Sequence, residues 1–265
     1  MSNHNKSKIW PALNLISYIV MVAMNALANI LPFNGMTTGA ISDSYPNLFA
    51  PAGFTFAIWG VIYLMLGAFV IFGFRGFDHG SIRLVYKRIS MAFIFSSLVN
   101  ALWIVCWHYR LIPLSMVLMI LIQLSLIYIF FQLKGLRLSQ NETRFVRIPF
   151  GIYFGWITVA TIANMTTMLV SLGWRGIPIS EEVWTILILM IGLAIGGATA
   201  LRNLDFAYGA VLIWAYIGIL TKHLITSGFN GVYKGVILTL ILSLVLLVLL
   251  EGFVFYMNRR FTKRR

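Results

Sequence analysis

The chain alternates between long apolar runs and short polar breaks, and this pattern predicts its architecture. An α-helix needs about 20 mostly apolar residues to cross a bilayer. Runs of this kind predict eight spans, at 11–32, 53–74, 89–108, 112–133, 148–171, 183–201, 206–221 and 235–257. The seventh run is short for a span, so we expect it to be tilted less or to form a hairpin with its neighbour. The pattern predicts an all-α fold, a polytopic membrane helical bundle of about eight transmembrane helices.

The composition agrees with lipid as the solvent. Of the 265 residues, 60% are hydrophobic and only 10% are charged, whereas soluble domains carry roughly 25% charged residues. Too few charges are present to coat a surface that faces water. The bilayer is therefore the first expected partner.

The net charge of +13 indicates orientation rather than binding to nucleic acid, because basic residues of membrane proteins collect in cytoplasmic loops. With the N-terminus inside, the inner segments hold sixteen of the 20 lysines and arginines, and the outer segments hold only Arg110, Arg175, Lys222 and Lys234. Both termini are basic, so an odd number of spans would break this alternation. We expect eight spans, both termini in the cytoplasm and no nucleic-acid partner.

One alternative concerns the first span. Ala26-Leu27-Ala28 follows a basic start and an apolar run, as a signal-peptidase site does, and cleavage there would leave seven spans. The apolar run is long for a signal peptide. Asn25 and Asn29 on the same run are more typical of polar groups that pack between helices.

The sequence offers little for catalysis or metal binding. Cys106 is the only cysteine, and no two histidines have the spacing of metal ligands on one helix. Neither a Ser-His-Asp set nor paired carboxylates occur within the spans. We therefore expect no enzyme activity, no metal and no cofactor. The acidic candidates for ion coupling are Glu251, late in the last span, which we expect to pair with a neighbouring base, and Asp205 at a span end.

Three predicted spans carry aromatic and hydrogen-bonding residues at helical spacing. The stripes consist of Phe56, Trp59 and Tyr63 in the second span, Asn100, Trp103 and Trp107 in the third, and Tyr153, Trp156, Ala160 and Asn164 in the fifth. Each set lies on one side of its helix. An indole N–H or a carboxamide inside a span needs a partner, so these groups belong at positions that face protein. If the stripes converge, they line an aromatic pocket for a flat, mostly apolar ligand.

The competing interpretation of these stripes is ordinary packing between helices. Four tryptophans, one of which also belongs to the third-span stripe, lie near predicted span ends and are typical of an aromatic belt at the membrane interface, namely Trp10, Trp107, Trp174 and Trp184. Gly-x-x-x-Gly pairs at 151/155 and 192/196 allow close approach of helices, either within the chain or in a homodimer. The loop 34–50 is irregular and is either a functional lid or a plain connector.

Residues 48–63, with the sequence Leu-Phe-Ala-Pro-Ala-Gly-Phe-Thr-Phe-Ala-Ile-Trp-Gly-Val-Ile-Tyr, resemble the signature at the start of the second helix in the TspO/MBR family. Residues 98–103, Leu-Val-Asn-Ala-Leu-Trp, are similar to the family's third-helix motif. Residues 156–164, Trp-Ile-Thr-Val-Ala-Thr-Ile-Ala-Asn, resemble its fifth-helix motif, with Val159 in place of Phe. The chain thus resembles the longer bacterial branch called tryptophan-rich sensory protein.

The resemblance implies a five-helix core at 1–171 and three further helices with a basic tail at 172–265. It implies an integral membrane sensor or binding protein for a porphyrin or another flat tetrapyrrole, located in a bacterial cytoplasmic membrane and often dimeric. The ligand-binding residues it implies are Trp59, Asn100, Trp103, Trp156, Ala160 and Asn164, with Tyr63 and Tyr153 beside them. Some members recognise sterol through a Tyr-and-basic pattern, which residues 84–88 match in a predicted loop. A secondary transporter of a small hydrophobic or amphipathic compound is the alternative.

Overall fold

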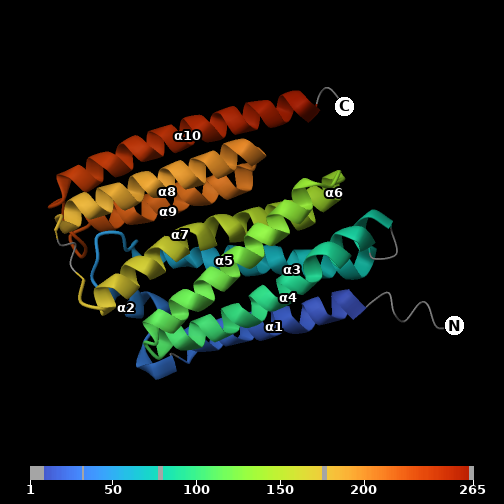
Figure 1. Ribbon diagram of the computed structural model, residues 1–265, viewed down its shortest axis with the longest axis horizontal. Helices are drawn as coiled ribbons and strands as arrows, with labels where there is room; N and C mark the ends of the chain where they lie inside the picture. The colour runs from blue at the N-terminus through green and yellow to red at the C-terminus, as the bar shows by residue number, and fades with distance from the viewer. Residues whose placement is uncertain (1–8, 32, 77–79, 175–177, 263–265) are drawn as a thin grey trace. The chain divides into compact units, whose positions relative to one another are not determined.

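The computed structural model describes residues 9–31, 33–76, 80–174 and 178–262, and within them the secondary structure is helical. Eight of these helices have the length and apolar composition to cross a membrane, which confirms the predicted multi-pass helical bundle (Figure 1). They are α1 (Ile9–Ile30), α3 (Ile58–Gly76), α4 (Gly80–His108), α5 (Ile112–Lys134), α7 (Ile148–Ser171), α8 (Glu181–Asn203), α9 (Phe206–Leu224) and α10 (Lys234–Thr262).

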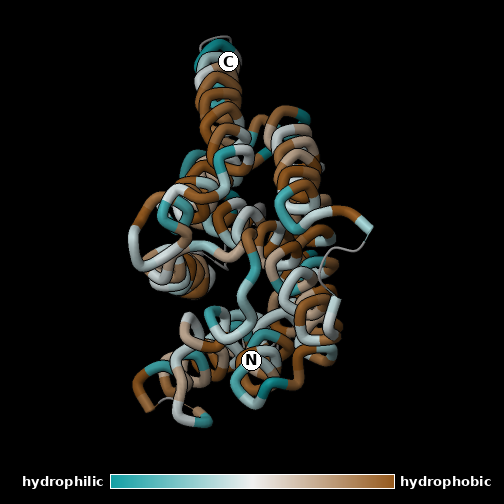
Figure 2. The backbone as a smooth tube through the Cα atoms, turned by 90° about the vertical axis from the view of Figure 1, so that its left-hand side faces the viewer, coloured by the Kyte–Doolittle hydropathy of each residue, from teal (hydrophilic) through white to brown (hydrophobic). Residues whose placement is uncertain are grey.

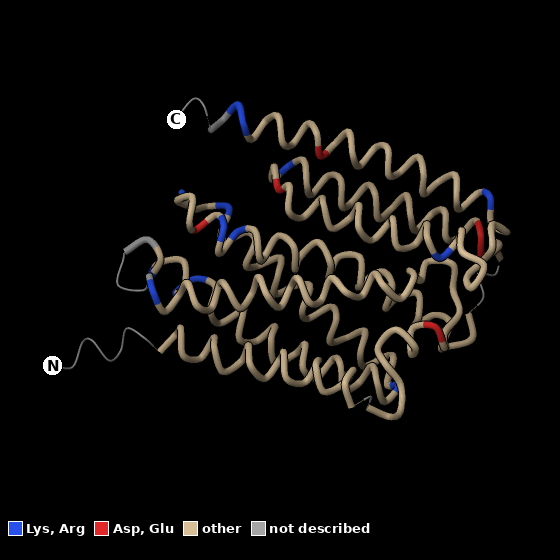
Figure 3. The backbone as a smooth tube through the Cα atoms, turned by 180° about the vertical axis from the view of Figure 1, so that it is seen from behind, with Lys and Arg blue, Asp and Glu red and all other residues tan. Residues whose placement is uncertain are grey.

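The helices are apolar on their outer faces as well as inside. Leu64, Met91 and Leu249 expose about two thirds or more of their surface, at 72%, 67% and 66%. Exposed apolar side chains in such numbers would cause association in water, whereas they are suited to acyl chains. Hydrophobic residues are frequent along the helices in Figure 2, and most of the Lys, Arg, Asp and Glu residues in Figure 3 lie near helix ends. The protein is therefore a multi-pass membrane protein.

Short helical elements occupy segments that hydropathy alone could not define. The first connection contains η1 (Phe33–Gly35), α2 (Thr38–Asp43) and η2 (Gly53–Ala57), so it is more ordered than an irregular loop. Before α7, the chain forms α6 (Gln140–Glu142) and η3 (Thr143–Arg147). Ser139 begins this run with a capping box, in which its hydroxyl accepts from the Glu142 N–H and the Glu142 carboxylate accepts from the Ser139 N–H. The fifth helical path therefore begins well before residue 148.

The chain divides into two compact units, which we describe separately. The first comprises Met1–Thr38 and Ile58–Phe154, and the second comprises Gly39–Ala57 and Gly155–Arg265. In the first unit, α4 packs against α1 and α5, and α3 packs against α1. Asn14 on α1 donates a hydrogen bond of 2.9 Å to the Ser90 hydroxyl on α4. These contacts join helices that are far apart in the sequence.

The prediction that residues 84–88 lie in a loop is wrong, because α4 begins at Gly80 and includes this segment. The Tyr86 side chain is fully buried, and its ring stacks on Phe69 with 4.8 Å between centroids. The Tyr86 hydroxyl donates to the Phe69 carbonyl. This tyrosine holds α3 and α4 together and is closed to a lipid headgroup.

In the second unit, α8, α9 and α10 lie side by side (Figure 1). Glycines on α7 and α8 allow these two helices to approach α9 closely. A Cβ atom on Gly155 would lie 2.8 Å from the Tyr208 carbonyl oxygen, and one on Gly192 would lie 3.0 Å from the Tyr216 hydroxyl. These two glycines of the Gly-x-x-x-Gly pairs therefore serve packing within the chain.

The segment 39–57 is bonded to α9 at several points along its length. Lys222 forms an ion pair of 2.8 Å with Asp43, and the His223 Nε2 donates to the Leu48 carbonyl at 2.9 Å. The Trp214 indole donates to the Thr55 carbonyl at 3.0 Å, and the Ala52 N–H donates to the Gly218 carbonyl at 3.0 Å. Residues 39–57, which belong to the connection between α1 and α3, are thus held in place by α9.

Candidate functional site

An aromatic cluster, formed by Trp59, Tyr63, Trp103 and Tyr153, lies in the first unit. Trp59 stands at its centre, with ring centroids 5.6 Å from Tyr63, 6.0 Å from Trp103 and 6.2 Å from Tyr153. The Tyr63 ring is nearly parallel to Trp59, at 22°, and the Tyr153 ring is inclined at 62°. These distances are within the range of favourable aromatic pairs. The predicted stripes of the second and third spans therefore meet.

The cluster follows from the helical spacing of its residues. On α3, Trp59 and Tyr63 are four residues apart and share one side of the helix. On α4, Trp103 and Trp107 have the same spacing and stack with 5.8 Å between centroids. Trp103 is 5% exposed and Tyr153 is fully buried, whereas Trp59 and Tyr63 are half-buried. The α3 side of the cluster is thus its more accessible side.

Buried asparagine side chains form a hydrogen-bond network next to the aromatic cluster. Asn100 is fully buried, donates to the Tyr153 hydroxyl at 3.3 Å and accepts from the Asn25 amide at 2.8 Å. Asn29 donates to the Asn25 carbonyl, and its side-chain oxygen accepts from the Thr38 N–H. Asn25 and Asn29 therefore have the packing role predicted for them. The pairing of Asn25 with Asn100 spans 75 positions and had no signal in the sequence.

One polar atom of the cluster has no hydrogen bond. The Tyr63 hydroxyl is buried and has no partner among the residues that the structure describes. Burying a hydroxyl without a partner costs about 1–3 kcal/mol by mutational measures. The hydroxyl therefore keeps an unused hydrogen-bonding capacity inside the cluster.

His108, on which sequence reasoning placed no role, orders the end of α4. Its Nδ1 donates to the Phe33 carbonyl at 3.1 Å, since a carbonyl can only accept, and its Nε2 lies 3.1 Å from the Thr38 hydroxyl. The Trp107 indole donates to the Thr38 carbonyl at 3.2 Å. These bonds hold the start of the first connection against the aromatic stripe of α4.

The other three predicted site residues belong to the second unit. Trp156 is 3% exposed and packs edge to face with Phe56, at 6.2 Å between centroids. Asn164 is 2% exposed, and Ala160 is half-buried between them on α7. The structure thus brings five of the eight predicted residues together in the first unit, namely Trp59, Tyr63, Asn100, Trp103 and Tyr153.

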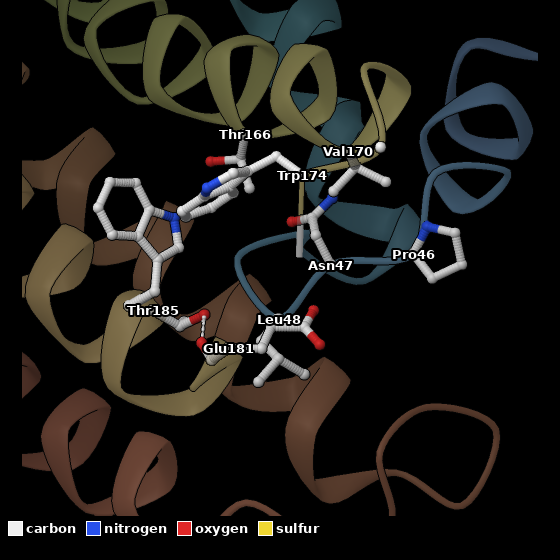
Figure 4. Close-up of a pocket in the computed structure, with 10 residues that line it drawn as sticks. Pro46, Asn47, Leu48, Thr166, Val170, Trp174, Glu181 and Thr185 are labelled. Carbon is white, nitrogen blue, oxygen red and sulfur yellow. Dashed lines mark hydrogen bonds between the residues drawn. The ribbon is translucent and has the colours of Figure 1, made fainter. Parts of the chain in front are cut away.

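A cavity of about 320 Å³ lies elsewhere, within the second unit. Figure 4 shows Asn47, Thr166, Trp174 and Glu181 around it. The sequence assigned Trp174 to a membrane-interface belt, and the turn that places it beside α8 could not be foreseen. This cavity is separate from the residues of the aromatic cluster.

Two acidic side chains are buried among α8, α9 and α10. Asp205 is 4% exposed and caps α9 by accepting from the Tyr208 N–H at 3.1 Å. Glu251 on α10 is also 4% exposed, and neither of its carboxylate oxygens has a hydrogen-bond partner in the described part of the chain. Asp205 is close enough to repel a charge on Glu251. The predicted pairing of Glu251 with a base is therefore wrong, because the charged group close to it is the acid Asp205.

No group of three His, Cys, Asp or Glu side chains able to hold a metal ion occurs in the ranges that the structure describes. The site groups are instead aromatic rings, carboxamides and a hydroxyl. Such groups bind by stacking and hydrogen bonding, and they supply no strong nucleophile or base.

Comparison with known proteins gives one match. A family model described as TSPO-like protein matches residues 11–253, a range that reaches from α1 into α10. No curated protein matches the chain. No solved structure matches it either. The family model therefore covers α8, α9 and most of α10 as well as the segments that carry the motifs.

Proposed function

We propose, from the premise that this chain belongs to the family of TSPO-like proteins, that it is a membrane sensor or binding protein for a flat hydrophobic ligand such as a porphyrin. The ligand-binding residues of this proposal are Trp59, Tyr63, Asn100, Trp103, Tyr153, Trp156, Ala160 and Asn164. A porphyrin-like macrocycle is mostly apolar and reaches a helical bundle through the lipid phase. The membrane is thus both the solvent of the protein and the source of its ligand.

The observation that carries this proposal is the group of rings around Trp59. Three aromatic side chains have centroids within 6.2 Å of it, and its own ring is half-buried rather than enclosed. A flat conjugated ring system gains from stacked and edge contacts with such side chains. The Tyr63 hydroxyl adds a donor for the polar edge of a tetrapyrrole.

The residues on α7 extend the same chemistry. Trp156 supplies a second indole, Ala160 is small enough to leave room for a ring, and Asn164 supplies a carboxamide. Asn100 acts differently, because its amide already bonds to Asn25 and Tyr153. We expect Asn100 to position the Tyr153 ring rather than to contact the ligand directly.

Titration with protoporphyrin tests this function. The purified protein in nanodiscs should shift the porphyrin absorption band in a saturable way, a signal that survives tryptophan replacement. The triple change Trp59→Phe, Trp103→Phe and Trp156→Phe should weaken binding about tenfold, since each smaller ring loses part of an aromatic contact of about 0.5–1.5 kcal/mol and the three losses add.

The matched control replaces Trp174 and Trp184 by Phe, because these indoles line the separate cavity. This double variant should bind protoporphyrin as the parent protein does. Equal affinity of the parent and the triple variant would remove the aromatic cluster from the proposal.

Secondary transport of a hydrophobic or amphipathic compound is the second candidate, and Glu251 specifically favours it. An acidic side chain buried inside a membrane span is costly and usually marks an ion or proton path. Proton-driven uptake of protoporphyrin into proteoliposomes, lost in Glu251→Gln with binding retained, would establish transport. If uptake by the parent protein and by Glu251→Gln does not depend on the proton gradient, binding remains as the only proposed role.

Orientation and assembly complete the proposal. Both termini lie in the cytoplasm of a bacterial cell, because the basic residues then accumulate on the inner side. A homodimer is compatible with the wide apolar faces of the helices. Activity of a cytoplasmic reporter fused after Arg265, and inactivity of one that requires export, would test the orientation.

A further inference from the structure

The cavity of the second unit, which we call the indole pocket, has a chemistry of its own. It is lined by α7, by α8, by Gly173 and Trp174 between them, and by the part of the first connection that follows α2 (Figure 4). The lining includes Asn47, Thr166, Trp174, Glu181, Trp184 and Thr185. Its volume of about 320 Å³ is at the small end of ligand sites, which span about 300–1,000 Å³. The pocket is therefore suited to a small molecule rather than to a tetrapyrrole.

Local sequence explains how the pocket forms. After α7, Gly173 adopts a φ of +81°, which favours glycine, and the Trp174 N–H donates back to the Leu169 carbonyl at 3.0 Å. This turn folds Trp174 over the end of α7. Ser180 then caps α8 by accepting from the Val183 N–H at 3.2 Å, which places Glu181 in the first turn of the helix.

Two indoles form one corner of the pocket. The Trp174 and Trp184 rings lie 4.7 Å apart between centroids with 73° between their planes. The two rings thus meet edge to face, and both line the cavity. The faces of indoles carry negative electrostatic potential and attract cations more strongly than other aromatic side chains do.

The polar groups of the pocket are mostly acceptors. The Thr166 hydroxyl donates to the Ile162 carbonyl at 3.0 Å, and the Thr185 hydroxyl donates to the Glu181 carbonyl at 2.8 Å. Both hydroxyls have therefore used their protons and offer lone pairs to the cavity. The Glu181 carboxylate adds a negative charge at the exposed side.

One donor breaks this pattern. The Trp184 indole N–H is buried and has no hydrogen-bond partner within the described ranges. A buried donor without a partner is costly, so a ligand oxygen that accepts from it would be favoured. The pocket thus combines a corner for a cation with a single N–H for an acceptor.

We propose that the indole pocket binds a small organic cation, an ammonium group on a short body that also carries a hydroxyl or another oxygen. Trp174 and Trp184 hold the cationic head by cation–π contact, Glu181 neutralises its charge, and the Trp184 N–H binds the oxygen. This site lies wholly in the second unit and is independent of porphyrin binding at the aromatic cluster.

Choline and its neutral carbon isostere 3,3-dimethylbutan-1-ol provide the probe pair, because they share shape and hydroxyl but differ in charge. The full chain in nanodiscs should bind choline saturably by calorimetry and should show quenched tryptophan emission. The neutral alcohol should bind about tenfold more weakly or worse, since desolvated cation–π contacts contribute up to about 2 kcal/mol. Equal binding of the two probes, or binding of neither, would overturn the proposal.

Two neighbouring carboxylates give a matched pair of variants. Glu181→Gln removes the charge that lines the pocket and should weaken choline binding about fivefold or more, at the upper end of an exposed ion pair. Glu182→Gln makes the same charge change on a residue outside the lining, whose Oε1 accepts from the Gly235 N–H at 3.0 Å, a bond that an amide oxygen can keep. It should bind choline normally.

Trp184→Phe separates the two roles of the indole. This variant keeps a weaker aromatic face and loses the N–H, so it should lower the affinity for tetramethylammonium, which has no oxygen, only modestly and lower that for choline several-fold more. Parallel losses for the two cations would contradict the proposed donor role. Protoporphyrin binding measured on the same variant shows whether the aromatic cluster is still intact, so failure at one site is distinguishable from failure at the other.

Discussion

Asn100 and Glu251 are both polar and almost completely buried within predicted membrane spans, yet their surroundings differ. Asn100 has an acceptor in Tyr153 and a donor in Asn25, supplied by two other helices. Glu251 has no hydrogen-bond partner in the described ranges and faces the repulsion of Asp205. The comparison teaches that burial alone does not identify function. A buried group whose partners are supplied by the chain stabilises the fold, whereas one without them requires a proton or a ligand.

Placing an acid at position 100 and an amide at position 251 should give the largest difference in unfolding free energy. Asn100→Asp keeps the acceptor for Asn25 but loses the donor to Tyr153 and buries an acid, so we expect a loss of about 3 kcal/mol in unfolding free energy. Glu251→Gln makes the reverse change, from an acid to an amide of similar size. Its unfolding free energy should differ from that of the parent by no more than about 1 kcal/mol. Unfolding in mixed micelles measures both. Similar losses for the two variants would erase the distinction.

A smaller effect should come from Gly209, which packs against Glu251. A Cβ atom at this position would collide with the Glu251 carboxylate. We expect Gly209→Ala to cost about 2 kcal/mol, as overpacking does. Gly252→Ala on α10 is the control, because a Cβ there meets nothing within 4 Å.

The same collision predicts a rescue. Adding Glu251→Ala to Gly209→Ala should restore most of the lost unfolding free energy, since the obstructing carboxylate is gone. Thermal unfolding in detergent measures the recovery. An additive loss in the double variant would show that Gly209 acts through backbone freedom rather than through this contact.

The smallest effect concerns the exposed ion pair of Lys222 and Asp43. Asp43 exposes 52% of its side chain, so solvent screens the pair strongly. Lys222→Gln should change the unfolding free energy by less than about 1 kcal/mol. The difference should shrink further in high salt. A large, salt-independent loss would place this pair with the buried polar groups instead.

Hydropathy was sufficient to predict the eight spans, because every long helix must present apolar residues to lipid. The clearest difference is α4, which begins at Gly80 rather than near residue 89, since its first turns carry Arg83, Lys87 and Arg88. Basic residues are tolerated at helix ends near the membrane interface, and a hydropathy pattern cannot distinguish them from a loop.

The candidate site was predictable in part. Helical spacing placed Trp59 with Tyr63 and Trp103 with Trp107, and the motif order indicated that their helices meet. The support from Asn25 and the turn that builds the indole pocket were not predictable. Both depend on contacts or backbone geometry that leave no periodic pattern in the sequence, such as the positive φ of Gly173.

The bonds between the segment 39–57 and α9 have a consequence for biogenesis. Thr55 and Trp214 are 159 positions apart, and Asp43 and Lys222 are 179 apart. Non-local contacts of this kind form late, because the intervening chain must be in place first. During synthesis, this stretch therefore lacks these partners until α9 has been made. A ribosome that stalls before α9 would leave this segment open to proteases, and its cleavage would report on how far synthesis had progressed.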